Sequence, residues 1–215
     1  LTNQGYLSIY KAIDGPNNEI AFSARLKSFE GILLKDSTFH TQPFAKKKQM
    51  DSKIIITPDS KHFILKTTSS LDSEEQLKVS IVAFDQELNK IFEKSFTSNG
   101  TIDKTQFLKE ELTNDLYFFY AYNDWTHPKV ITRVECLIPG KERVSLDLDI
   151  KELILNVGFG INNETNEFLI TGTYGQVTED KTRKTLVNQY SGYFTNFYHL
   201  NTLEKNTSFT ETLSE

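Results

Sequence analysis

A four-strand unit recurs about every 50 residues, and this repeat constrains the fold more than any other feature of the chain. Each unit reads as strand, tight turn, strand, longer loop, strand, tight turn, strand. In the second to fourth units the first turn falls at 58–61, 113–115 and 162–166, and the second at 85–88, 139–141 and 201–204. One such unit cannot bury its apolar faces alone, so we expect the units to stack on one another.

Alternation of apolar and polar residues indicates strands with one buried and one wet face. It is clearest in 143–150, where Val144, Leu146 and Leu148 alternate with polar residues. Helical spacing is scarce, although 104–112 fits a helical turn or two as well as a strand. The predicted strands are 6–13, 19–26, 31–35 and 39–45 in the first unit, 53–57, 62–69, 78–84 and 89–96 in the second, 105–112, 116–122, 129–138 and 143–150 in the third, and 153–161, 167–174, 192–200 and 206–213 in the fourth.

The predicted fold class is all-β. A four-stranded antiparallel meander repeated with short links is the blade of a β-propeller. We expect about four such blades in a single domain of residues 1–215, either closed on themselves or forming part of a larger propeller. The approximate blades are 5–48, 53–97, 104–150 and 153–214. The alternative is an antiparallel β-sandwich, which needs the same alternation and similar turns.

Three segments resemble TolB-type, WD-like propeller repeats. Thr57–Leu65 (TPDSKHFIL) and Asp14–Ser23 (DGPNNEIAFS) are similar to the S-P-D-G-K-x-I-A-F pattern, and Phe84–Lys90 (FDQELNK) looks like the second turn of that family. The third and fourth units lack Pro-Asp, and Ser60 replaces the glycine. The resemblance implies a fold, in which the Pro-Asp turn joins the innermost strand to the second. It also implies a periplasmic or cell-surface location, and a binding site at the central channel and on the face formed by the loops after each second and each fourth strand.

Composition excludes several functions. The net charge is −5 and the only tight basic run is Lys46–Lys48, so no nucleic-acid partner is expected. No apolar run approaches the roughly 20 residues of a membrane helix. Cys136 is the single cysteine, which prevents an internal disulfide, and its place in an alternating strand predicts a small buried hydrophobe. The chain starts at Leu1 without methionine, which suggests a processed or cut form.

Motifs for catalysis and for metal binding are absent from the sequence. There is no His-Glu-x-x-His, no paired-cysteine motif, no Gly-x-Ser-x-Gly and no phosphate-binding glycine loop. Asp147 and Asp149 share the polar face of one strand instead of facing each other across a cleft. We therefore predict no catalytic residue, no metal and no cofactor, and a role that is not enzymatic.

Aromatic residues give the most suggestive candidate site. Most rings in 116–125 and 190–198, including Phe118, Tyr120, Phe194 and Tyr198, are expected in the core because the second strand of a blade is covered on both faces by its neighbours. Trp125 follows the second strand of the third unit, and Tyr190 ends a long loop predicted at 175–191. Aromatic side chains in loops that also carry a polar group are suited to protein contacts or to stacking on sugar rings. The predicted binding residues are Trp125, Asp124, His127, Tyr122 and Tyr190.

Three functional hypotheses fit these features. The preferred one is a non-catalytic binding or scaffold propeller that contacts a protein partner in an extracytoplasmic or cell-envelope assembly. The alternative is a carbohydrate-recognising module or glycan-active propeller that uses Trp125, Tyr190 and Asp124. A third is a propeller whose peptidase domain lies outside this chain.

Overall fold

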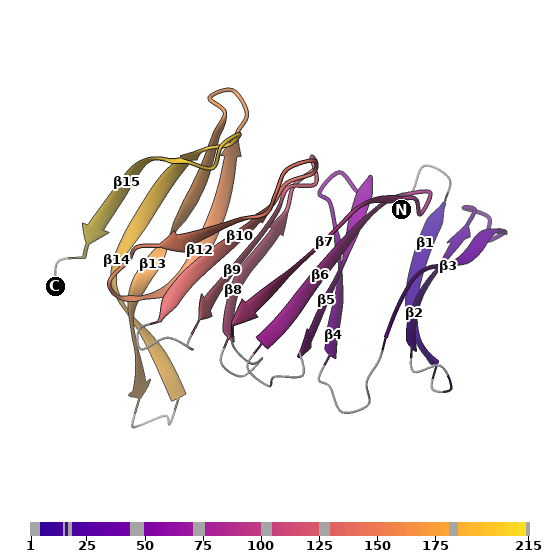
Figure 1. The fold of residues 1–215 in the computed structure, drawn as a ribbon, viewed down its shortest axis with the longest axis horizontal. Coiled ribbons are helices and arrows are strands. Elements are labelled where there is room, and N and C mark those ends of the chain that lie inside the picture. Colours follow the sequence, from indigo (N-terminus) through magenta and orange to yellow (C-terminus); the bar gives the residue numbers. More distant parts are fainter. Residues whose placement is uncertain are drawn as a thin grey trace. The chain divides into compact units, whose positions relative to one another are not determined.

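The computed structural model describes residues 5–14, 16, 19–43, 50–70, 76–99, 105–124, 130–180 and 185–213. Within these ranges the chain forms strands and no helix (Figure 1). The strands are β1 (Tyr6–Asp14), β2 (Glu19–Lys27), β3 (Leu33–Pro43), β4 (Met50–Ile56), β5 (His62–Ser70), β6 (Gln76–Asp85), β7 (Lys90–Asn99), β8 (Thr105–Leu112), β9 (Phe118–Asp124), β10 (Ile131–Leu137), β11 (Val144–Leu148), β12 (Leu153–Asn162), β13 (Glu167–Asp180), β14 (Thr185–His199) and β15 (Lys205–Thr212).

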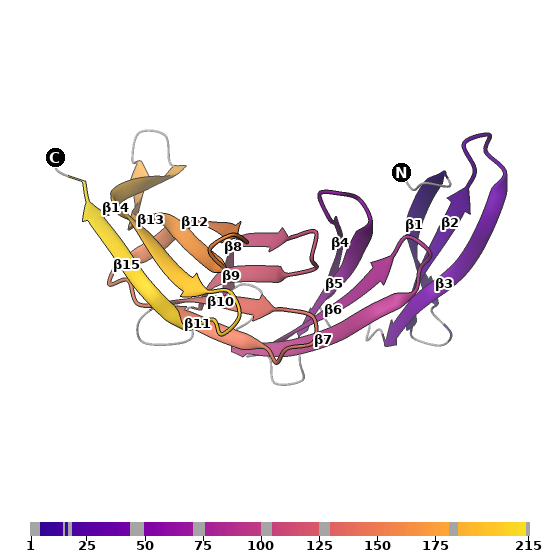
Figure 2. The same ribbon diagram turned by 90° about the horizontal axis from the view of Figure 1, so that it is seen from above.

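The strands form antiparallel meanders in which each sheet contains only consecutive strands. The sheet orders are β1-β2-β3, β4-β5-β6-β7, β8-β9-β10-β11 and β12-β13-β14-β15 (Figure 2). Each sheet is a β-propeller blade, so the all-β propeller prediction is confirmed. A β-sandwich would exchange strands between its sheets, and no described strand does so.

The first sheet has three strands where four were expected. The predicted short strands 31–35 and 39–45 are one strand, β3, which pairs with β2 along its whole length. Its register shifts between Phe22 and Ser23 and again between Leu26 and Lys27. These irregularities interrupt the alternation, and the sequence pattern therefore looked like two strands.

The predicted long loop 175–191 is wrong, because its described part is a hairpin. β13 runs on to Asp180 and β14 begins at Thr185. Val177 and Tyr190 are 40 % and 51 % exposed. A two-stranded ribbon that is exposed on both faces has no apolar alternation, so the strand pattern was not recognisable there. Tyr190 therefore lies on a strand, paired with Gly175.

The chain divides into two compact units, each with its own core. Unit 1 comprises 1–101 with 112–116, and unit 2 comprises 102–111 with 117–215. The core of unit 1 joins β2 to β5 and β6 through apolar residues that include Phe22, Phe63 and Phe84. The core of unit 2 joins β9 and β10 to β12–β14, and Phe119 and Phe168 stack there at 4.2 Å.

The predicted core residues are buried. All of β9 is buried on both faces, including Phe118 and Tyr120. Phe194 and Tyr198 lie in the core of unit 2, and Cys136 is fully buried beside them. Burial also raises the pKa of the Cys136 thiol.

The tight turns repeat one backbone device. In each turn one residue has a positive φ, and this residue lies one, two or four positions before the next strand. For a residue with a side chain this conformation costs about 1–2 kcal/mol. Burial of the leucine side chains offsets that cost in several turns. The residues are Ser60, Leu116 and Asn166 after first strands, and Leu88, Gly140 and Leu203 after third strands.

Candidate functional site

The structure separates the residues predicted as a loop site. Tyr122 and Asp124 lie in β9 and are 1 % and 0 % exposed. Tyr190 is exposed on β14. Trp125 and His127 lie outside the described residues. Tyr122 and Asp124 therefore face the interior of the protein instead of a loop surface.

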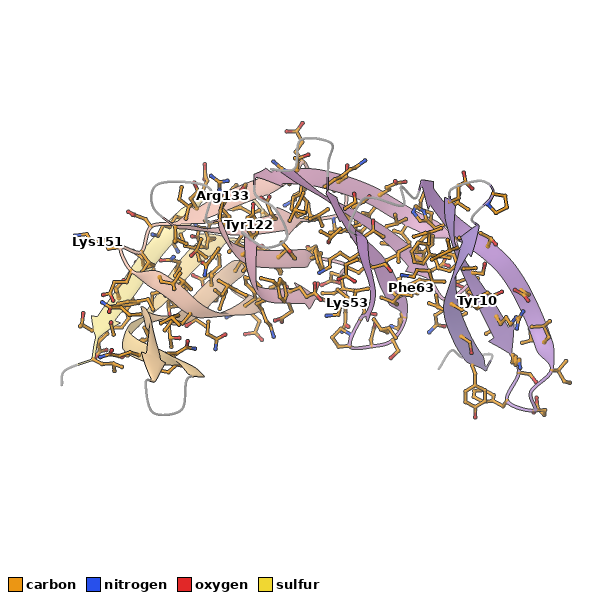
Figure 3. All side chains as sticks on the ribbon, turned by 90° about the horizontal axis from the view of Figure 1, so that it is seen from below. Tyr10, Lys53, Phe63, Tyr122, Arg133 and Lys151 are labelled. Atoms are coloured by element: carbon orange, nitrogen blue, oxygen red, sulfur yellow. The ribbon has the colours of Figure 1, made fainter. Side chains whose placement is uncertain are left out.

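Tyr122 and Asp124 belong to a polar cluster on one face of the sheet β8–β11, buried at one end and exposed at the other. We call it the polar ladder. Tyr122 is opposite Arg133 in the β9–β10 register, and Arg133 is opposite Asp147 in the β10–β11 register. Figure 3 shows the labelled Tyr122 and Arg133 close together on unit 2. The members are Tyr122, Asp124, Arg133, Glu135, Ser145 and Asp147.

Arg133 bridges two carboxylates. Its Nη1 donates to Asp124 Oδ2 at 3.0 Å and its Nε donates to Asp147 Oδ1 at 2.9 Å. Burial acts to lower the pKa of Arg133, but the hydrogen bond and charge of Asp147, together with the charges of Tyr122 and Asp124, outweigh it and the pKa is raised. The side chain of Asp124 is 0 % exposed and that of Asp147 is 59 % exposed. The ladder thus runs from the surface at Asp147 to a fully buried carboxylate.

Glu135 is the second buried carboxyl of the ladder. Its Oε1 accepts hydrogen bonds from Tyr122 Oη at 3.2 Å and Ser145 Oγ at 3.1 Å. Its Oε2 lies 3.6 Å from Arg143 Nε but has no hydrogen-bond partner. Burial raises the pKa of Glu135, although Arg143, Ser145, Tyr122 and Arg133 all act to lower it. Burial is also the main cause of the raised pKa of Tyr122. Such a carboxyl can hold or release a proton closer to neutral pH than an exposed one.

The opposite face of the same sheet ties it to the next sheet of unit 2. Thr132 Oγ1 donates to Asn123 Oδ1 at 2.6 Å, and Asn123 Nδ2 donates to the carbonyl of Ile154 at 3.0 Å. Asn123 and Thr132 are both buried. These bonds hold β9 against β12 and so fix the strand that carries Tyr122 and Asp124.

Sequence reasoning missed Arg133, Glu135 and Ser145. A usable signal was present, because in β10 the charged residues Arg133 and Glu135 alternate with the buried residues Val134 and Cys136. A third strand packed on both faces has no wet side for these charges, so they must pair inside the protein.

Unit 1 contains two small pockets along the seam between β1 and β4. Lys11 Nζ donates to Ser52 Oγ at 3.3 Å across this seam. The larger pocket has a volume of about 220 Å³ and is lined by Ile9, Tyr10, Lys11, Phe22, Ser52, Ile54 and Leu65. The smaller has about 80 Å³ and is lined by Leu7, Ile9, Ile56, Ser60, Lys61, His62, Phe63 and Gln86.

The described residues provide no metal site. Among them, no group of three or more His, Cys, Asp and Glu side chains could hold an ion. His40, His62 and His199 lie on different strands, and the His40 ring sits 6.0 Å from Phe22. Over the same part of the chain, no helix is long and apolar enough to cross a membrane.

The fold defines the class of the protein as a β-propeller, and several solved structures resemble it. No family model matches the chain, and no curated protein matches it. A chimera of apocarotenoid oxygenase (ACO) and RPE65 matches in its monoclinic and trigonal crystal forms. In both, the identity is 10 % and the TM-score 0.51, over 98 % of this chain and 47 % of that one. A mutant of Synechocystis apocarotenoid oxygenase matches at 9 % identity and a TM-score of 0.49, over the same shares. This chain thus spans about half the length of the structures that it matches.

These matches contradict the prediction of a non-catalytic scaffold propeller. Two of the matching structures with a TM-score of 0.51 are crystal forms of a chimera between apocarotenoid oxygenase, an enzyme by its name, and RPE65. At about 10 % identity the likeness shows the fold alone. The TolB-type resemblance, the protein partner and the extracytoplasmic location stay predictions.

Proposed function

We propose that this chain builds part of a catalytic β-propeller that acts on a small organic molecule. The observation that carries the proposal is the match to the ACO/RPE65 chimera, which includes 98 % of this chain at a TM-score of 0.51. The chain covers 47 % of that structure, so the proposal concerns a larger propeller to which these blades contribute.

Glu135 and Tyr122 are the residues best suited to chemistry in this part of the propeller. Burial raises the pKa of Glu135, which favours the protonated carboxyl that a general acid requires. Its Oε2 has no hydrogen-bond partner and is the atom from which a proton would be given or taken. Tyr122 and Ser145 hold Oε1 and so orient the carboxyl group.

A turnover assay of the full-length protein tests this proposal. The natural polypeptide that contains these residues would be incubated with an apocarotenal as probe, with oxygen uptake and product formation as readouts. Glu135→Gln keeps the shape of the side chain and removes the titrating proton. Loss of a general acid costs about 10²–10⁴-fold in rate, so a loss in this range is expected.

Asp149→Asn is the matched control, because Asp149 is an exposed carboxylate outside the ladder. It should turn over at the wild-type rate. Turnover that is unchanged in Glu135→Gln would remove Glu135 from the reaction but leave the enzyme proposal standing. No turnover of the folded full-length protein with the apocarotenal probe would contradict the proposal for an apocarotenoid as the small organic molecule. Fractionation of native cells tests the extracytoplasmic location separately.

A further inference from the structure

Glu135 lies deep in the protein, although a general acid must regain a proton from solvent after every turnover. Only 3 % of its side chain is exposed, and its Oε2 atom has no hydrogen-bond partner. A proton moves between atoms that lie within hydrogen-bond distance, or through one water. The side chains around Glu135 therefore determine how its carboxyl group exchanges a proton with water.

Within the described part of the chain, four side chains act on the Glu135 carboxyl group, and three of them cannot pass a proton to it from water. Arg133 and Arg143 keep their charge, because a guanidinium is not deprotonated in proteins. Tyr122 donates from Oη to Oε1 but is 1 % exposed, so water does not reach its phenol. The fourth side chain is that of Ser145.

Ser145 connects the carboxyl group to the surface. It lies directly opposite Glu135 in the β10–β11 register, and its Oγ donates to Glu135 Oε1 at 3.1 Å. β11 is the edge strand of its sheet, and Ser145 is exposed on it. A serine hydroxyl has one donor proton and two acceptor lone pairs. Ser145 can therefore accept a proton from water while it gives its own proton to the carboxylate.

We propose that Ser145 is the residue through which Glu135 exchanges its proton with solvent. In the protonating direction, a hydronium ion gives a proton to Ser145 Oγ, the original Ser145 O–H bond breaks, and its proton forms an O–H bond at Glu135 Oε1. Ser145 ends with a hydroxyl, as it began, so the net change is one proton moved from solvent to the carboxylate. The reverse steps return the proton to water.

This route gives the two oxygens of Glu135 different tasks. Oε1 accepts from Ser145 and Tyr122 and is the oxygen on the solvent side. Oε2 has no hydrogen-bond partner and stays free for a reacting molecule. Because a carboxylate shares its charge between both oxygens, a proton given from Oε2 is replaced at Oε1. The purpose of the exchange rests on the proposed function, but the exchange itself needs no substrate.

Infrared spectroscopy after a rapid drop in pH measures the exchange in the natural polypeptide that contains these residues. A protonated carboxyl group has a C=O stretching band that a carboxylate lacks, and the band of Glu135 is the one that disappears in Glu135→Gln. The pKa of Glu135 is raised, so a drop that ends above the usual range of exposed carboxyl groups, near pH 4, reports on it selectively. The growth of this band gives the rate of proton uptake.

Ser145→Thr and Ser145→Val form a matched pair. Both side chains are branched, suit a strand and have nearly the same shape, but only threonine keeps a hydroxyl. Proton uptake should be close to the wild-type rate in Ser145→Thr and about tenfold slower or more in Ser145→Val. Ser208→Val is the control, because Ser208 is an exposed serine of β15, outside the polar ladder, and it should leave the rate unchanged.

The titration midpoint of the same band separates a relay from a purely structural role. The hydrogen bond from Ser145 lowers the pKa of Glu135, so Ser145→Val should raise the midpoint in either case. A raised midpoint with the wild-type rate would show that Ser145 only stabilises the carboxylate, which overturns the proposal. Equally slow uptake in Ser145→Thr and Ser145→Val would also overturn it, as would a wild-type protein without a titrating Glu135 band.

The outcome is distinguishable from that of the turnover assay, because no substrate is present. Hydroxyl-dependent proton uptake in a protein that turns over no apocarotenal would support the relay and leave the reaction unsupported. Turnover that depends on Glu135, with uptake that is equally fast in Ser145→Val, would support the reaction and overturn the relay.

Discussion

Replacement of Arg133 by alanine tests whether the polar ladder stabilises unit 2. The substitution removes the guanidinium that lies 3.0 Å from the fully buried Asp124 and 2.9 Å from the exposed Asp147. Breaking a buried ion pair costs about 3–5 kcal/mol, since it leaves an uncompensated charge, whereas an exposed pair contributes about 0–1 kcal/mol. The Asp124 side of the bridge therefore decides the effect. Because Asp124 makes further interactions, we expect a loss of about 3 kcal/mol, at the lower end of the range.

The matched control is Arg25→Ala. Arg25 Nε lies 2.8 Å from Asp36 Oδ2, almost the same distance as in the ladder, but the two side chains are 53 % and 36 % exposed. Solvent screening should leave the stability of this variant close to that of the wild type. The two variants separate the effect of burial from the effect of removing an arginine–aspartate contact.

Urea unfolding followed by circular dichroism measures the loss. Thiol labelling of Cys136 adds a local probe, because this fully buried thiol lies three residues from Arg133 on β10 and reacts only when that strand opens. A loss of about 3 kcal/mol corresponds to a fall in Tm of about 6–12 °C for a chain of this size. Addition of Asp124→Asn should recover part of the loss, since a neutral amide needs no counter-charge. Equal losses in Arg133→Ala and Arg25→Ala, or no recovery in the double variant, would refute the reasoning.

Three further predictions concern the turns, the buried carboxyl and a glycine. Ser60→Gly should raise the free energy of unfolding by about 0.5–1 kcal/mol, because it relieves a left-handed backbone conformation at an exposed position. Leu116→Gly should lower the free energy of unfolding, because it also removes a buried side chain. The urea midpoints of the two variants measure both effects. The pKa of Glu135 is higher in the folded state than its ordinary value of 4.5. The stability of the wild type should therefore fall as pH rises above 4.5, until the pKa of the folded state is passed. Unfolding curves at several pH values measure this slope, which Glu135→Gln should lack. Gly172→Ala should lower Tm by several degrees, because the added Cβ would lie 2.1 Å from the Asn156 carbonyl and 2.8 Å from the Phe194 ring; a Tm equal to that of the wild type would contradict this.

Strands with one wet face could be predicted from the sequence, and their turns with them. The expected 19–26 became β2 (Glu19–Lys27), and the expected 143–150 became β11 (Val144–Leu148). Alternation gives no strand signal in the described residues of the β13–β14 hairpin at 176–177 and 188–190, because all of them are exposed. The polar ladder was missed for another reason: β10 was predicted as a strand, but that its charged residues pair within the protein follows only from the packing of both its faces.

The place of a strand within its blade is a different kind of property. The DGPNN segment correctly predicts a hairpin, since β1 and β2 pair from Tyr6 with Lys27 to Asp14 with Glu19. A turn motif involves only the two strands that it joins, and it cannot indicate whether they are the first and second or the second and third of a blade. That order depends on the other strands of the blade and of its neighbour. Along β1 from Leu7 to Lys11 the neighbours on β4 run from Ile56 back to Ser52, so β1 is antiparallel to β4, as the second strand β5 is. A resemblance between the turn at 14–18 and the turn at 58–61 is therefore compatible with different places in the blade.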